Sequence, residues 1–152
     1  MDETENTATE SRRAWMSLLA RAPEDRLMAL WADYVPQPAF DWLRRPEIGT
    51  VMLRGRMGAS GAPFNLGEMT VTRCSVELKG GTVGHGYVQG RGKARAEAAA
   101  LIDALMQTSA AEAVRQAVLD PLAAAMQSAR AARAARAAAT RVEFFTLVRG
   151  ED

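Results

Sequence analysis

The dipeptide Gly80-Gly81 constrains the fold of this chain more than any other feature, because it separates two segments of alternating side chains. Residues 68–79 precede it and residues 82–89 follow it. Two such segments joined by a two-residue glycine turn are typical of a β-hairpin. Within residues 68–79 the alternation changes phase, which predicts a β-bulge near Arg73. The sequence therefore predicts an antiparallel hairpin at the centre of the chain.

Two further strands are indicated before this hairpin. Residues 40–42 and 50–56 also alternate between apolar and polar side chains. Residues 45–49, between them, have the composition of a turn. The prediction is a mainly antiparallel sheet of about four to five strands over residues 39–90.

Apolar residues at helical spacing predict helices on both sides of the sheet in sequence. Trp15, Leu18 and Leu19 form one face of a helix before the strands. Asp120-Pro121 predicts the start of the last helix, which continues to about Ala139. The fold class is therefore α+β, with the sheet packed against N- and C-terminal helices.

A chain of 152 residues suffices for one domain with its own core. Residues 1–9 carry several acidic side chains and no basic one, so we expect a flexible acidic tail there. Residues 10–140 contain no linker long enough to divide them. We expect them to form a single α+β domain.

Residues 141–152 form an apolar C-terminal segment that we expect to dock onto another subunit. The adjacent Phe144 and Phe145 would face opposite sides of an extended strand, and Arg141 and Arg149 flank them. These four residues are the candidates for partner docking. In the alternative interpretation, the segment is the last strand of this domain's own sheet.

Composition argues against several classes of function. The formal net charge of +1 is unlike that of a globally basic nucleic-acid binder. The single cysteine, Cys74, and the single histidine, His85, cannot form a disulfide or a Cys/His zinc site, so no metal is expected. No apolar run is long enough to span a bilayer, and the N-terminus lacks the basic start of a secretory signal. We therefore expect a cytoplasmic protein with no membrane or nucleic-acid partner.

The strongest candidate for ligand binding is the run Gly90-Arg91-Gly92-Lys93, directly before a helix that begins near Ala94. A helix N-terminus presents unpaired N–H groups and a partial positive charge. Glycines allow close approach of a ligand, and two side chains add full positive charges. The four residues therefore predict a phosphate site. A flexible connection with solvated charges is the equally weighted alternative.

Two other features have a functional and a structural interpretation. Arg130, Arg133 and Arg136 recur every three residues, which suits either a partner surface or the polar side of an amphipathic helix whose alanine face packs inward. We favour the second of these. His85 would need a cleft and an orienting partner to act in catalysis, and a half-buried sheet histidine is the favoured interpretation.

Several segments together resemble the PhnG family, a small subunit of the bacterial carbon–phosphorus lyase system. Their order and spacing carry the resemblance more than any one segment. The matching segments are Trp15–Ala20, Arg56–Gly58 with Gly61 and Phe64, Gly67–Arg73, Gly84 with Tyr87–Arg91, Ala96–Glu97 with Ala100–Gln107, and Thr140–Glu151.

The resemblance implies an accessory subunit of the carbon–phosphorus lyase complex in organophosphonate catabolism. Its partners would be the other core subunits, and ATP and an alkylphosphonate would be substrates of the complex. The complex displaces adenine from ATP to give a ribose 1-alkylphosphonate 5-triphosphate. This chain would hold no cofactor of its own and would be inactive alone, because it shows no set of catalytic residues.

We carry no catalytic residue over from the family, and we add Arg56 to the phosphate-binding candidates. The alternative function is a free-standing phosphate- or nucleotide-binding protein that uses Gly90–Lys93.

Overall fold

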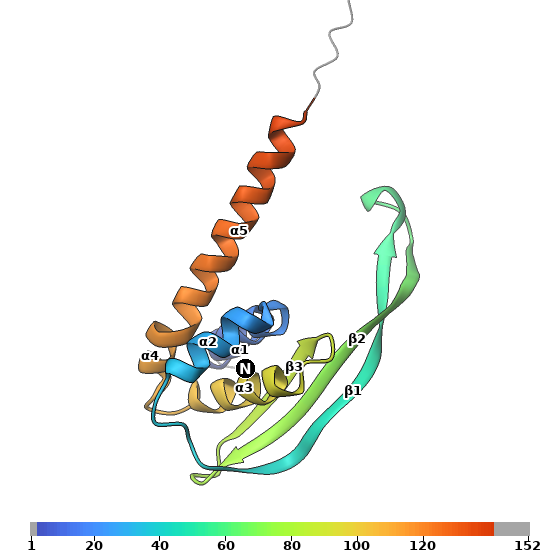
Figure 1. The fold of residues 1–152 in the computed structure, drawn as a ribbon. Helices are drawn as coiled ribbons and strands as arrows, with labels where there is room; N and C mark the ends of the chain where they lie inside the picture. The colour runs from blue at the N-terminus through green and yellow to red at the C-terminus, as the bar shows by residue number, and fades with distance from the viewer. Residues whose placement is uncertain (1–2, 142–152) are drawn as a thin grey trace, which may run out of the picture.

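The computed structural model describes residues 3–141. Helices, strands and one short 3-10 turn follow the order α1, α2, β1, η1, β2, β3, α3, α4, η2 and α5, where η2 is a π-helical turn. Their bounds are Glu3–Arg21, Glu24–Asp33, Phe40–Arg56, Met57–Ala59, Pro63–Leu78, Val83–Gln89, Lys93–Leu105, Ala111–Val114, Arg115–Leu119 and Asp120–Ala139. In Figure 1, α1, α2 and α3 lie on the same side of the sheet. This arrangement confirms the α+β fold class.

The central hairpin confirms the prediction from Gly80-Gly81. Strand β2 pairs antiparallel with β3 from Val71↔Gln89 to Glu77↔Val83 without a register shift. At the turn, Gly81 has a φ of 81°, which favours glycine, and its N–H donates to the Leu78 carbonyl at 2.8 Å. The turn therefore forms for the local reason that the sequence indicates.

The sheet has three strands in the described residues rather than four to five, in the order β1-β2-β3. The segments 40–42 and 50–56 belong to one strand, β1, so the predicted turn over 45–49 is wrong. From Arg44 to Glu47, three steps along β1 face only two along β2, from Ser75 to Arg73. Extra residues bulge out of β1 while pairing continues on either side.

The same register shows that the bulge predicted near Arg73 is wrong. Strand β2 stays in uninterrupted register with β3 there, and the extra residue lies on β1. The side-chain alternation in residues 68–79 changes phase because residues on both faces of β2 are buried. Cys74 belongs to the core under the helices, whereas Val71 is buried outside that core cluster.

Helix α3 lies against β3 because two strand positions have no side chain. A Cβ atom on Gly84 would clash with the Ala100 carbonyl, and one on Gly86 would clash with the Ala96 carbonyl. Alanines on the facing side of α3 complete this close contact.

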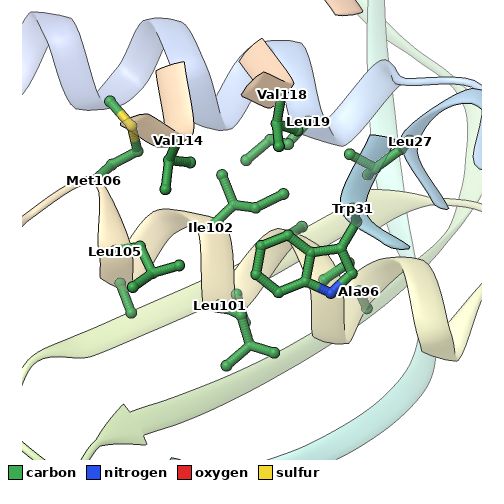
Figure 2. Close-up of a cluster of buried hydrophobic side chains, with 14 of the residues drawn as sticks. Leu19, Leu27, Trp31, Ala96, Leu101, Ile102, Leu105, Met106, Val114 and Val118 are labelled. Carbon is green, nitrogen blue, oxygen red and sulfur yellow. The ribbon is translucent and has the colours of Figure 1, made fainter. Parts of the chain in front are cut away.

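The hydrophobic core extends from this contact toward the outer helices. In Figure 2, the side chain of Ile102 lies among side chains from α1, α2 and the α4–η2 segment. They include Leu19, Leu27, Trp31, Val114 and Val118.

The two ends of the helical part differ from the predictions in detail. Helix α1 begins at Glu3, so residues 3–9 of the segment expected to be a flexible tail are helical in this structure, and residues 6–10 are exposed. Helix α5 begins at Asp120 and Leu122 is buried, but Asp120 is not the predicted N-cap, because Leu119 before it is already helical and no side chain caps the start. The segments α4, η2 and α5 follow one another without a break. The alanine face does not pack inward along its whole length, however, because every residue from Gln127 to Thr140 is exposed. Figure 1 shows this part of α5 extending away from the body.

Candidate anion site at the start of α3

The turn between β3 and α3 is held firmly against β2. Gly90 has a φ of 87°, a left-handed conformation that favours glycine. Its N–H donates to the Thr70 carbonyl at 2.8 Å, and its carbonyl accepts from Thr72 Oγ1 at 2.7 Å. The two hydrogen bonds fix the position from which α3 begins.

Helix α3 starts without a capping side chain. Gly92 is its N-cap residue, and no side-chain hydrogen bond caps the first turn. Arg91 and Lys93 are exposed on either side and have no ion pair or hydrogen bond with any described residue. The helix end and two cations therefore create a region of positive potential.

Arg95 is a third cation at this end of α3, and no sequence pattern predicted that it would be buried. Only 9% of the residue is exposed. Its Nη1 donates to the Ala22 carbonyl at 2.6 Å, whereas Nε is buried without a partner among the described residues. The guanidinium also reaches toward the turn, because a Cβ on Gly90 would lie 3.6 Å from Nη2. A buried cation with an open donor favours a nearby anion.

Glu24, in the first turn of α2, supplies a carboxylate at the same place. A Cβ on Gly92 would lie 2.7 Å from Glu24 Oε2, so only glycine allows this approach. No hydrogen bond or ion pair holds Glu24 to another described residue. The protein's own carboxylate therefore competes with any external anion for the positive end of α3.

Arg56, the remaining predicted phosphate ligand, lies away from this turn. Arg56 ends β1 at the far end of the β1–β2 hairpin, where its Nη1 donates to the Gly61 carbonyl at 3.0 Å. Its strand partner Pro63 is seven residues along β2 from Thr70, or roughly 23 Å in an extended strand. The structure thus does not bring Arg56 to Gly90–Lys93. Arg141 is exposed after α5, and Phe144, Phe145 and Arg149 lie outside the described residues.

His85 lies on the exposed face of β3. Its Nδ1 is 2.9 Å from Ser75 Oγ on the neighbouring strand. The Asp103 carboxylate accepts a hydrogen bond from the His85 backbone N–H at 2.9 Å and not from the imidazole. The arrangement is not a Ser-His-Asp triad, in which the carboxylate orients the ring.

Asp103 is a buried polar residue that no sequence pattern indicated. The residue is fully buried in α3. It accepts hydrogen bonds from Arg12 Nη2 at 2.7 Å and from Trp15 Nε1 at 2.9 Å, in addition to the bond from His85. One carboxylate therefore joins α1, α3 and β3, and its acceptor capacity is used for structure.

Cys74 is a buried free thiol rather than a reactive nucleophile. Burial raises its pKa from 9.0 to about 11, and the negative charge of Glu97 adds to this effect against a hydrogen bond with the Gly86 backbone. The thiolate is the reactive form, so Cys74 is inert near neutral pH. Within residues 3–141, no three or more His, Cys, Asp and Glu side chains gather as metal ligands would.

The chain is similar to proteins of phosphonate metabolism. A family model described as "Phosphonate metabolism protein PhnG" matches residues 10–150. The alpha-D-ribose 1-methylphosphonate 5-triphosphate synthase subunit PhnG of Rhizobium meliloti (strain 1021) is 45% identical to the chain over 149 residues. The aligned part covers 98% of this chain and 96% of that protein. In the described residues, no helix has the length and apolar character needed to cross a membrane.

Proposed function

The chain belongs to the PhnG family, and we propose that it acts as a non-autonomous subunit of a ribose 1-methylphosphonate 5-triphosphate synthase. In this role it supports the carbon–phosphorus lyase complex during organophosphonate catabolism. The observation that carries the proposal is the 45% identity to a subunit of that synthase along almost the whole of both chains. The complex uses ATP and therefore works in the cytoplasm.

The chemistry of the reaction suits a supporting role. An oxygen of the alkylphosphonate attacks the ribose C1′ of ATP, the bond from C1′ to adenine breaks, and adenine leaves with a proton. This step requires a proton donor at the base and cations around the triphosphate. The single imidazole of the chain is paired with Ser75, and the Asp103 carboxylate is used in structural hydrogen bonds. In this proposal the proton donor belongs to another subunit.

Reconstitution tests this function directly. The chain is incubated with ATP and methylphosphonate, alone and together with the other subunits encoded beside it. Adenine release is followed by chromatography. We expect release only when this chain and its partners are all present. Adenine release by the isolated chain, or undiminished release by the partners without it, would contradict the proposal.

Within the complex, the positive end of α3 is proposed to contact a phosphate-bearing ligand or an acidic loop of a partner. Arg91 and Lys93 are exposed and unpaired among the described residues, and Arg95 Nε is a buried donor without a partner. In this proposal the Glu24 carboxylate occupies the anion position when neither the ligand nor the partner loop is bound.

Two variants with opposite expected effects test this site. Changing Arg91 and Lys93 together to Ala removes two charge-assisted contacts and should weaken binding of inorganic tripolyphosphate to the complex about tenfold. Changing Glu24 to Gln removes the competing charge and should strengthen binding. Titration calorimetry measures both effects. If neither variant changes tripolyphosphate binding or assembly, the run Gly90–Lys93 is only a turn.

Residues 141–152 remain a proposed docking segment. A chain that ends at Thr140 should stay folded and should no longer join the complex. Circular dichroism and co-purification measure the two properties. Loss of folding would instead assign the segment to the core of this domain.

The alternative function is a free-standing protein that binds a nucleotide or phosphate at the start of α3. The open Nε of Arg95 is the observation that favours it. Tight binding of ATP by the isolated chain, lost in the Arg91 and Lys93 variant, would support this alternative over the subunit role.

A further inference from the structure

A groove of about 790 Å³ lies where α5 leaves the body of the molecule. The α1–α2 junction forms one wall and the middle of α5, residues 125–133, forms the other. Leu18, Pro23 and Met126 are among its apolar lining residues. The groove therefore offers apolar surface as well as charge.

Arginines dominate the charge of the groove. Its lining includes Arg21, Arg26, Arg130 and Arg133 but only one acidic residue, Asp25. Arg21 turns back onto its own helix, with Nε donating to the Ser17 carbonyl at 3.0 Å. The other three arginines have no ion pair or hydrogen bond with any described residue. The lining of the groove therefore carries a net positive charge.

The basic character continues along α5 beyond the groove. Leu122 and Met126 pack against the body, and Arg133 and Arg136 follow on the same face of the helix. The sequence from Pro121 to Arg141 contains no acidic residue. More than half of the 20 residues of α5 are alanine, the strongest helix former, so the exposed part can be helical without packing. The face that meets the body therefore becomes an open basic stripe.

We propose that this groove and stripe bind an acidic amphipathic segment of another subunit of the synthase. The proposal rests on the proposed function, because it names the chemistry of a partner in that complex. Acidic side chains would pair with Arg26, Arg130 and Arg133, and apolar side chains would cover Leu18 and Met126. The apolar lining and the net charge of only +1 favour a protein segment over a nucleic acid.

Charge reversal in the assembled complex tests the proposal. Arg26, Arg130 and Arg133 are changed together to Glu, and the matched control carries Lys at the same positions. Each chain is co-expressed with the other subunits, and the affinity of assembly is measured by mass photometry over a dilution series. We expect the Glu variant to assemble at least about tenfold more weakly and the Lys variant to stay within about threefold. Circular dichroism of the isolated chains verifies that both variants fold.

A photo-cross-linker at Ala129, an exposed groove residue four positions before Arg133 on the same face of α5, identifies what covers this surface. Cross-links to an acidic stretch of another subunit support the proposal, and cross-links to a neutral or basic stretch overturn it. Equal assembly of the Glu variant and the unchanged chain would also overturn it. Binding of a labelled DNA duplex that the Glu variant loses would assign the surface to nucleic acid instead. If the unchanged chain itself fails to assemble, the proposed function is contradicted and this inference with it.

Discussion

At the scale of single residues, the buried carboxylate of Asp103 accepts hydrogen bonds from three other residues. It is fully buried and binds donors from Arg12, Trp15 and the His85 backbone. An Asp103→Ala change leaves these donors without an acceptor, although Arg12 is 34% exposed and can regain water. We expect a loss of about 2–3 kcal/mol in the free energy of unfolding, measured by urea denaturation. Asp41→Asn on the exposed surface of β1 is the control and should change it by less than about 0.5 kcal/mol. Equal effects of the two changes would contradict the structural role of the Asp103 carboxylate.

Cys74 makes stability depend on pH in an alkaline window. Its pKa is raised from 9.0 to about 11 in the folded protein, so the unfolded chain loses this proton first as pH rises. The contribution is fully present below pH 9 and is lost between about 9 and 11, up to roughly 3 kcal/mol. Urea denaturation at pH 8 and pH 11 should show a larger loss for the unchanged chain than for Cys74→Ala. A parallel decrease in both proteins would mean that other groups cause it.

At the scale of elements, the contact between β3 and α3 depends on glycine. Gly86→Ala would place a Cβ against the Ala96 carbonyl and 3.0 Å from Cys74 Sγ. The strand and helix must separate, and we expect a loss of about 3 kcal/mol or more in the free energy of unfolding. Gly80→Ala is the matched control, because a Cβ there has no atom within 4 Å. Thermal unfolding measures the melting temperature of each variant. Similar melting temperatures would show that α3 can shift without cost.

In the whole molecule, the body and the distal part of α5 are energetically separate. Every residue from Gln127 to Thr140 is exposed, whereas the core cluster ends in α5 at Leu122 with Met126 packed against it. A chain truncated after Gln127 should therefore keep its thermal midpoint within about 2 °C. It should also lose assembly with the partner subunits. Differential scanning calorimetry measures the midpoint, and a large decrease would assign the distal helix to the stability of the body.

The sequence by itself determined those features that depend on neighbouring residues. The hairpin at Gly80-Gly81 follows from turn geometry and side-chain alternation. Pro121 lies in the first turn of α5, where its fixed φ is compatible with a helix. The resemblance to the PhnG family rested on ordered segments of sequence, and the family match bears it out. Local rules could not show that 40–42 and 50–56 form one strand, because the bulges between them depend on pairing with β2.

Only the tertiary structure decided which charges are buried and which surfaces remain open. Arg12 and Asp103 are 91 residues apart in sequence, and Glu24 reaches Gly92 only because α2 packs beside α3. Arg95 has the same side chain as Arg91, yet its place on the inner face of α3 buries it. Along α5, one repeating Ala and Arg pattern passes from groove wall to open stripe, because the body ends beneath it. Burial is a property of the segments that meet, and no periodicity within one segment contains that information.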